Sequence, residues 1–234
     1  LVRSRGLGDV YKRQALYEMF SNISIKPCVR DLWRRFEKHL QRAVEITSLG
    51  LDFHMEHMHE VFPELVLDLL CYGPIEKGLD ASHGGVEFYN LCVDGSSLAT
   101  VADSFAALEQ RIEKEGLITW HEMLEFLDND FTRAENTRLM LHNIPRYGCN
   151  GTNADEWAVR ISQTFTKFVK EKPTPAGFNM IPGLFSWASM IDMGYGISAT
   201  PNGRHANSPI SQGANPDPGF MKGSSAPTAI AVAV

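Results

Sequence analysis

The stretch Ser198–Ala229 reads S-A-T-P-N-G-R-H-A-N-S-P-I-S-Q-G-A-N-P-D-P-G-F-M-K-G-S-S-A-P-T-A. Between Gly194 and Pro227 lie six glycines and five prolines, too many for a helix or a central strand. A flexible linker has a similar composition. However, the stretch carries few charges, is not a simple repeat, and contains turns of distinct chemistry at residues 201–203 and 215–216. We therefore predict an ordered loop inside a larger domain.

The two ends of the sequence indicate a piece of something longer. Residues 1–14, L-V-R-S-R-G-L-G-D-V-Y-K-R-Q, show no apolar period and read like a translated sequencing adapter joined to a gene fragment. A natural basic arm is the alternative, and in either case this segment is excluded from fold reasoning. At the other end, the apolar run Ala229–Val234 stops in the middle of a predicted strand. We expect residues 15–234 to form part of a single larger domain.

Composition and charge exclude several classes of protein. The net charge is −6 over 234 residues, and because the first 14 residues are basic, the remainder is more acidic still. An acidic chain argues against a nucleic-acid backbone as partner. No apolar run approaches the roughly 18 residues of a membrane span, and no signal-peptide pattern is present. We therefore expect a cytoplasmic protein with neither nucleic acid nor a membrane as partner.

Apolar periodicity predicts helices in the first two thirds of the chain. Five are amphipathic or carry a start or stop signal, and Thr119–Glu122 forms a capping box with Ile118 and Met123 as a hydrophobic staple. A further helix is apolar on most sides, which indicates burial. The predicted helices run from Pro27 to about Glu60, Pro63 to Cys71, Ala99 to Lys114, Thr119 to about Asn129, Thr132 to before Pro145, and Asp155 to Val169.

Strands are predicted at two places. Val86–Val93 reads as a short strand, and Phe178–Met193 is apolar, broken by glycine and nearly uncharged, as expected of strands buried in a barrel or sheet. Helices first and buried strands later, joined by a long structured loop, indicate an α/β protein.

The most conspicuous metal-binding pattern is H-M-E-H-M-H-E at residues 54–60. On a helix, His54 and His57 share a face and Glu60 lies one step further along it, a set that suits zinc or iron. The pattern is not the H-E-x-x-H of metalloproteases, and its alternating methionines favour packing. We favour a polar helix face and predict no metal site, keeping a helical metal-binding protein as a rival interpretation.

The four cysteines are widely spaced and form no C-x-x-C pair, which fits a reducing cytoplasm and predicts neither a disulfide framework nor a zinc framework. Cys149 lies in a loop near a helix start, where the positive helix end activates a thiol. No histidine is placed by sequence to assist it, so we favour a loop residue without a role. Cys71 and Cys92 read as small core residues.

The end of the chain resembles a known family. A-T-P-N-G-R at residues 199–204 resembles the T-P-D-G-R element of the pyruvate formate-lyase domain of the glycyl radical enzymes. G-A-N-P at residues 213–216, followed by Gly219 and P-T-A at residues 227–229, resembles the continuation of that element.

Three segments further upstream extend the resemblance. G-G-V-E-F-Y-N at residues 84–90, A-D-S-F-A-A-L at residues 102–108 and I-P-R-Y-G at residues 144–148 resemble further elements of the family, and Asp155 then begins a helix as it does there. The order and spacing agree from about Ile25 to Val234.

The resemblance implies a fold and a chemistry. It implies that the chain is a fragment of a ten-stranded α/β barrel in an anaerobic enzyme whose glycyl radical generates a thiyl radical on a cysteine inside the barrel. It further implies a cysteine loop upstream and a glycyl loop downstream of this sequence, so we expect no catalytic residue and no bound cofactor here, and an inactive fragment. A radical-SAM activating enzyme, a small-molecule substrate and a second copy in a homodimer are the implied partners.

Within the family, the sequence leaves the reaction open. Acyl transfer to CoA with formate release, as in pyruvate formate-lyase, is favoured by the wording Gly213-Ala-Asn-Pro216; this reaction makes CoA a possible cofactor. Dehydration or C–N or C–S cleavage of a small polyol, amino-acid-like or amine substrate is the alternative, favoured by Ile210-Ser211. A non-catalytic barrel relative is a further rival. Asn202 in place of the family's Asp, Gln212 in place of Asp, and the loop that begins at Cys149 depart from the pattern.

Candidate substrate contacts come from the predicted strand that precedes the T-P-N-G-R turn, because the resemblance implies that this strand lines the substrate pocket. In a strand, alternation places Ser189, Ile191 and Met193 on one face, and we predict that this face meets substrate; packing in the barrel core is the alternative. The family-motif residues of the loop, to which we assign a structural role, are Thr200, Pro201, Asn202, Gly203, Arg204, Gly213, Asn215 and Pro216.

Overall fold

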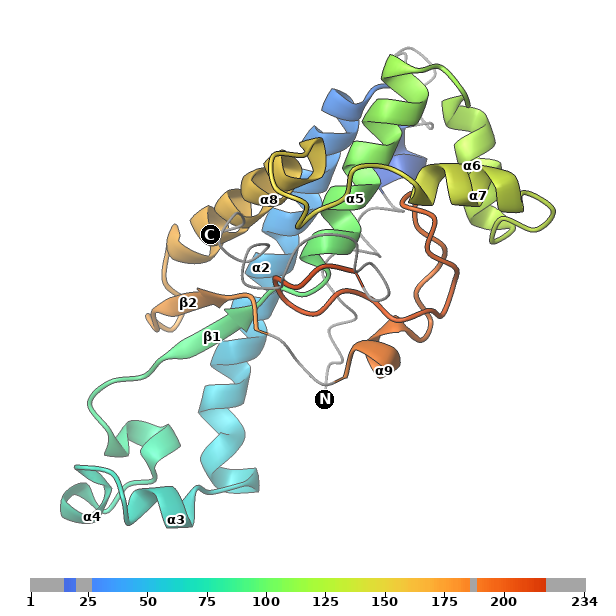
Figure 1. The fold of residues 1–234 in the computed structure, drawn as a ribbon. Helices are drawn as coiled ribbons and strands as arrows, with labels where there is room; N and C mark the ends of the chain where they lie inside the picture. Colours follow the sequence, from blue (N-terminus) through green and yellow to red (C-terminus); the bar gives the residue numbers. More distant parts are fainter. Residues whose placement is uncertain (1–14, 20–26, 186–188, 218–234) are drawn as a thin grey trace. The chain divides into compact units, whose positions relative to one another are not determined.

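The computed structural model describes residues 15–19, 27–185 and 189–217, and the chain separates into two compact units (Figure 1). Unit 1 comprises Leu1–Leu40, Asp94–Phe165 and Gly183–Val234, and unit 2 comprises Gln41–Val93 and Thr166–Pro182. Two predictions therefore lie outside the described residues: the adapter-derived segment 1–14 and the loop from residue 218 onward.

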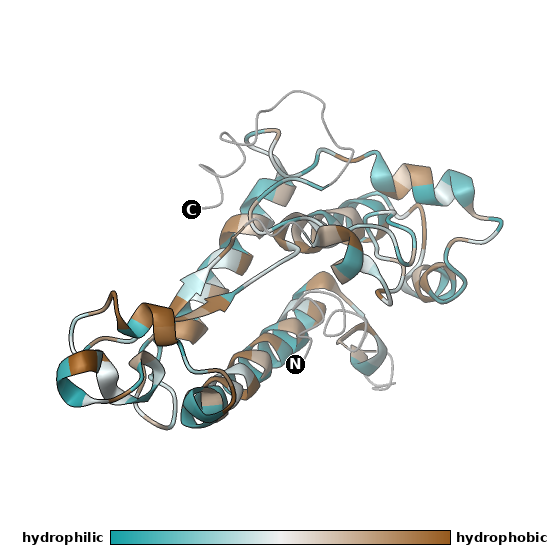
Figure 2. Cartoon of the chain, turned by 90° about the horizontal axis from the view of Figure 1, so that it is seen from below, coloured by the Kyte–Doolittle hydropathy of each residue, from teal (hydrophilic) through white to brown (hydrophobic). Residues whose placement is uncertain are grey.

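The long helix predicted near the start of the chain is confirmed as α2 (Val29–Val61), which continues through Gly50 without a break. Apolar and polar residues mix along its length (Figure 2). Its first turns bury the apolar positions that the sequence pattern selects, including Leu32 and Phe36, and also bury Trp33.

The core of unit 1 is an aromatic cluster at the crossing of three helices. Trp33 and Phe36 of α2 meet Phe105 of α5 (Leu98–Leu108) with ring centroids 5.7 and 5.6 Å apart, and Phe105 stacks on Trp157 of α8 (Asn153–Lys170) at 4.6 Å. Every residue of α5 is buried. Small residues make up much of this helix, which lets neighbouring elements approach it closely on all sides.

The remaining helices of unit 1 lie where the sequence predicts them, except that one of them begins later. The wide turn η2 (Glu109–Lys114) extends α5, and α6 (Trp120–Asp128) begins at the predicted capping box, with the Glu122 N–H donating to Thr119 Oγ1 at 3.2 Å. α7 (Glu135–His142) starts three residues later than Thr132. The reason is that the chain adopts positive φ at Asp130, Phe131 and Arg133, in a turn that buries Phe131.

Unit 2 holds the larger departures. The predicted strand Val86–Val93 is shorter and later, as β1 (Leu91–Asp94), which pairs with β2 (Met180–Gly183) in a two-stranded sheet. Two short helices, α3 (Leu65–Asp68) and α4 (Pro74–Lys77), and an irregular turn, η1 (Ala81–Gly85), precede β1.

The prediction of a buried helix over Pro63–Cys71 is wrong. Only the four residues of α3 are helical, and none of them is buried. Leu69 and Leu70 just beyond it are also exposed. A segment that is apolar on most sides gives no single face to bury, and the described part of unit 2 does not enclose it.

The prediction of a continuous strand up to Met193 is also wrong. Met190–Gly194 forms the short helix α9, closed by a hydrogen bond from the Met193 N–H to the Ser189 carbonyl at 2.8 Å. Gly194 explains the turn, because a Cβ there would lie 2.3 Å from the Ser208 carbonyl oxygen. The chain therefore packs against the following loop instead of extending as a strand. Across the described residues, no helix is long and apolar enough to cross a membrane.

Candidate functional site

The Gly- and Pro-rich loop is a buried, hydrogen-bonded turn over residues 198–217. The Thr200 N–H donates to the Arg204 carbonyl and the Gly203 N–H donates to the Thr200 carbonyl, each at 3.0 Å. All five residues from Thr200 to Arg204 are buried. Most of the polar groups buried here find hydrogen-bond partners among the described residues of unit 1, although Arg204 Nε does not.

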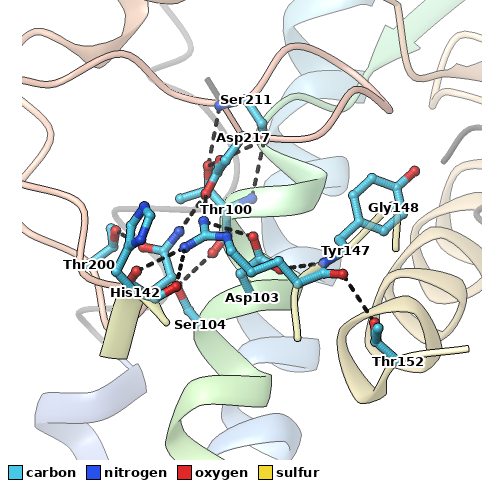
Figure 3. Close-up of polar contacts among 12 residues, drawn as sticks. Thr100, Asp103, Ser104, His142, Tyr147, Gly148, Thr152, Thr200, Ser211 and Asp217 are labelled. Atoms are coloured by element: carbon cyan, nitrogen blue, oxygen red, sulfur yellow. Dashed lines mark hydrogen bonds and ion pairs between the residues drawn. The ribbon is translucent and has the colours of Figure 1, made fainter. Parts of the chain in front are cut away.

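Arg146 takes part in several of the polar contacts that hold this turn, and Figure 3 labels its partners Asp103 and Asp217. Its Nη2 lies 2.8 Å from Asp103 Oδ2 and 2.5 Å from Asp217 Oδ2. The three side chains are 2%, 1% and 7% exposed. Its Nη1 donates to the Asn202 carbonyl at 3.2 Å. One guanidinium thus joins α5, the loop after α7 and both ends of the 198–217 loop.

Asp217 is the second junction of this network. Its Oδ1 accepts from Thr100 Oγ1 and its Oδ2 accepts from Asn202 Nδ2, both at 2.5 Å. Thr100 and Ser211 also bond to each other. The Thr100 N–H donates to Ser211 Oγ and the Ser211 N–H donates to Thr100 Oγ1, each at 3.2 Å. The first turn of α5 is therefore fastened to the C-terminal half of the loop, at Ser211 and Asp217.

The segment after Arg146 is held in the same way. The Tyr147 N–H donates to Asp103 Oδ1 at 2.8 Å and the Tyr147 hydroxyl donates to the Ala214 carbonyl at 2.8 Å. The Gly148 N–H donates to Asp155 Oδ1 at 2.7 Å, at the start of α8. We call Thr100, Asp103, Arg146, Tyr147, Asn202, Ser211 and Asp217 the buried polar cluster.

The buried polar cluster contains two acidic side chains, Asp103 and Asp217, but only one arginine. Burial raises the pKa of Asp103 to about 7; Arg146 opposes this rise and the nearby Asp217 carboxylate adds to it. Burial lowers the pKa of His142, and the positive charges of Arg146 and Arg138 lower it further, while Asp217 opposes them. Two carboxyl groups thus share one permanent positive charge.

Two glycines of the loop sit where a side chain does not fit. Gly203 has φ +82°, and a Cβ there would lie 2.6 Å from the Arg138 carbonyl oxygen. Gly213 has φ +40°, and a Cβ would lie 2.4 Å from the Leu184 carbonyl oxygen. Only glycine combines this backbone conformation with such close approach.

The other family-motif residues support the turn. Arg204 Nη1 donates to the Ser208 carbonyl at 2.7 Å and to the His205 carbonyl at 3.0 Å. Pro201 is buried, and the Asn215 N–H donates to the Gln212 carbonyl at 2.7 Å just before Pro216. These contacts are local to the loop, whereas Asn202 alone among the T-P-N-G-R side chains bonds to Asp217.

The three predicted substrate contacts do not share a face. In α9, Ser189 and Met193 are four residues apart on one side, while Ile191 lies on the other and is 56% exposed. The alternation that grouped them assumed a strand, which the helix replaces. That any of them meets substrate stays a prediction.

The structure also places the other candidates from the sequence. His57 stacks on Phe53 of its own helix with ring centroids 4.3 Å apart, while His54 and Glu60 are exposed. Over the described parts of the chain, no three His, Cys, Asp or Glu side chains gather as metal ligands. Cys149 is half-buried in the turn after Arg146, where its N–H donates to the Arg146 carbonyl at 3.3 Å.

Sequence reasoning missed the buried polar cluster as a unit. In the sequence, Asp103 and Arg146 stand out only as members of the family motifs, and Asp217 belongs to none of them. The available signal was charge in unexpected places: Asp103 interrupts an apolar helix, and Asp217 lies between two prolines in a nearly uncharged loop. A charged residue in such surroundings is usually paired when buried.

Comparison with known proteins finds matches over most of the chain. The family described as "Pyruvate formate lyase-like" matches residues 9–194. The trans-4-hydroxy-L-proline dehydratase of Clostridioides difficile is 25% identical over 190 residues, covering 81% of this chain and 24% of the relative. The isethionate sulfite-lyase of Oleidesulfovibrio alaskensis is 32% identical over 116 residues, covering 50% of this chain and 14% of the relative.

A solved structure shares the fold. The crystal structure of a glycyl radical enzyme from Archaeoglobus fulgidus superposes with a TM-score of 0.77 at 22% identity, covering 90% of this chain and 29% of that chain. The chain spans about a quarter of the length of the dehydratase that it matches. Its helix-rich architecture is therefore that of one part of an α/β barrel of this type.

Proposed function

We propose a function from the premise that this chain belongs to the pyruvate formate lyase-like family, whose model matches residues 9–194. The whole protein that contains it is proposed to be a glycyl radical enzyme that eliminates a small group from a small hydroxylated or sulfonated substrate. One observation carries this choice: the curated relatives described above are named for the removal of water and of sulfite. These names favour the dehydratase and lyase alternative over acyl transfer to CoA.

The proposed reaction also determines which cofactors and partners the whole protein requires. Elimination requires no acyl acceptor, so CoA has no part in it. The radical glycine and the cysteine that it oxidises are proposed to lie in other parts of the protein, and a radical-SAM activating enzyme is the proposed partner that installs the radical. The part described here supplies the frame of the barrel next to the site.

The buried polar cluster supports a positioning role for this frame. The loop that it fastens holds α9: the Ile210 N–H faces the Met190 carbonyl at 3.4 Å, and Gly194 packs under the Ser208 carbonyl. We propose that the side of α9 carrying Ser189 and Met193 meets substrate. Ile191, on the other side, provides a matched control.

The proposed reaction is tested on the whole protein, produced without oxygen together with its activating enzyme. Electron paramagnetic resonance measures the glycyl radical, and product analysis follows 4-hydroxyproline, isethionate, 1,2-propanediol and, separately, pyruvate with CoA. We expect a radical and turnover of an elimination substrate. Formation of formate and an acyl-CoA from pyruvate would contradict the proposal, and absence of any radical would favour a non-catalytic relative.

The role of α9 is tested with two variants of that protein. Met193→Trp is expected to change the relative rates on the elimination substrates while the radical yield stays at the wild-type level. Ile191→Trp is expected to change neither. Equal effects of the two substitutions on substrate preference would contradict the proposal that the Ser189 and Met193 side of α9 meets substrate. The proposed elimination reaction would not be affected by that result.

A further inference from the structure

The buried polar cluster contains two carboxyl groups that converge on one cation. Asp103 Oδ2 and Asp217 Oδ2 lie 2.8 and 2.5 Å from the same nitrogen, Nη2 of Arg146. Both carboxyl side chains are almost fully excluded from solvent, at 1% and 7% exposure. Two carboxylates held this close in a buried site repel each other, because water cannot screen them.

Among the described residues, no second cation binds Asp103 or Asp217. Burial and the charges of Arg146 and Arg138 lower the pKa of His142 of α7, which disfavours its charged form. Tyr147 is neutral, and its pKa is raised by burial and by the neighbouring acids Asp155 and Asp103. With both carboxyl groups ionised, the cluster would carry a net charge of −1 in a buried site, which costs much more free energy than binding a proton.

We propose that Asp103 keeps a proton in the folded cluster, beside the Asp217 carboxylate that binds the same guanidinium nitrogen, and that this proton keeps the loop of residues 198–217 attached to α5. The proton makes the cluster neutral, with one carboxyl group, one carboxylate and one guanidinium. Asp217 then keeps its bonds to Thr100 and Asn202 without repulsion from Asp103. Loss of the proton restores the repulsion and weakens the attachment of the loop. This inference concerns the fold and does not depend on the proposed reaction.

The direction of the pH dependence follows from proton linkage. The folded cluster keeps its proton up to a pH near the raised pKa of Asp103, about 7, whereas an opened loop exposes an acid with the ordinary value of 3.8. Between these values the closed loop binds one more proton than the open loop. Opening therefore becomes easier by about tenfold per pH unit across this window, and it levels off above the upper value.

Hydrogen exchange of two loop amides reports this opening. The Gly203 N–H bonds to the Thr200 carbonyl and the Ser211 N–H bonds to Thr100 Oγ1, so both exchange only when the loop detaches. After correction for the intrinsic effect of pH on exchange, we expect their opening constants to rise about a hundredfold from pH 5 to pH 7. From pH 7.5 to pH 8.5 we expect little further change.

Two variants distinguish the effect of this proton from the effects of other acidic groups that titrate in the same pH range. Asp103→Asn keeps the shape of a protonated carboxyl group and cannot ionise, so the hundredfold rise is expected to disappear. Glu125→Gln, on the exposed face of α6, is the matched control and is expected to keep the wild-type rise. The same rise in wild type and in Asp103→Asn would overturn the proposal.

A second variant and a direct measurement cover the case in which Asp103→Asn does not fold. Asp217→Asn removes the other carboxyl group and is expected to abolish the rise in the same way. In wild type, the ¹³C shifts of the aspartate carboxyl carbons should show one buried group that titrates near pH 7. Ionisation of both groups down to pH 5 would overturn the proposal whether or not the variants fold.

Discussion

The loop of residues 198–217 and the segment of residues 61–75 reverse the usual relation between residue type and burial. The loop is rich in glycine, proline and polar residues, yet Thr200, Asn202 and Ser211 are each 1% exposed. The segment is apolar, yet Val66 and Leu70 are 74% and 80% exposed. Burial within the described residues therefore follows the availability of partners and not hydrophobicity alone.

The difference has a physical cause in each unit. In unit 1, the buried polar cluster gives many polar groups of the loop hydrogen-bond partners, which offset much of the desolvation cost of their burial. In unit 2, α3 has only four residues and its neighbours are apolar on most sides, so no single face can be covered. Exposed apolar clusters of this kind mark contact surfaces.

The largest expected effect is at the centre of the cluster. Arg146→Met removes the only guanidinium bound to Asp103 and Asp217 among the described residues and leaves two buried carboxyl groups facing each other. We expect the free energy of unfolding to fall by about 3–5 kcal/mol in urea titrations at pH 8. Arg34→Met, an exposed arginine on α2, is the control and should stay within about 0.5 kcal/mol. A loss below about 1 kcal/mol for Arg146→Met would mean that the loop does not depend on the cluster.

Asn202→Asp places a carboxylate where Asn202 Nδ2 now donates to Asp217. We expect a loss of about 2–3 kcal/mol of unfolding free energy at pH 8, because a donor is replaced by a like charge in a buried site. The loss should shrink at pH 5, where the new acid can be protonated and donate. Asn207→Asp, at an exposed position of the same loop, should cost much less at both pH values.

A glycine pair isolates the close packing of the loop. Gly203 and Gly196 have nearly equal φ, +82° and +77°, but only Gly203 would carry a Cβ into contact, 2.6 Å from the Arg138 carbonyl oxygen. Gly203→Ala is expected to cost about 2 kcal/mol, and Gly196→Ala only the backbone penalty of about 1 kcal/mol. Equal losses of unfolding free energy would show that the turn accommodates a methyl group at Gly203, contrary to the structure.

The smallest effect is expected in the apolar segment. Leu70→Ser removes an isobutyl group that is 80% exposed, so the unfolding free energy should change by no more than about 0.5 kcal/mol. Leu108→Ser, at the buried end of α5, should cost several kcal/mol by comparison. A large loss for Leu70→Ser would place that side chain in a core and break the contrast between the two regions.

Local signals account for much of the fold. Apolar periodicity predicts α2, α5 and α8 to within a few residues, and the capping box at Thr119 fixes the start of α6, because these signals act within one helical turn. The short helix α9 was predicted as strand because an uncharged apolar run is compatible with either. The helical conformation of this segment depends on the packing of Gly194 against Ser208, a contact that local sequence does not reveal.

The candidate site was harder to predict than the fold. Turn chemistry indicates an ordered loop, and the motif residues Asp103, Arg146 and Asn202 are each visible in the sequence. The convergence of the cluster is not visible, because it joins residues up to 117 positions apart in the chain, from Thr100 to Asp217. Only the resemblance brought these motifs together, and it did so without indicating that they touch.

Native-state hydrogen exchange at one pH tests most directly whether the polar loop is core and the apolar segment is surface. The account predicts that the amides of Gly203 and Ser211 exchange at least about a thousandfold more slowly than those of Leu70 and Cys71, whose hydrogen bonds close a single exposed turn. Comparable exchange of the two pairs, or faster exchange of the loop amides, would contradict it.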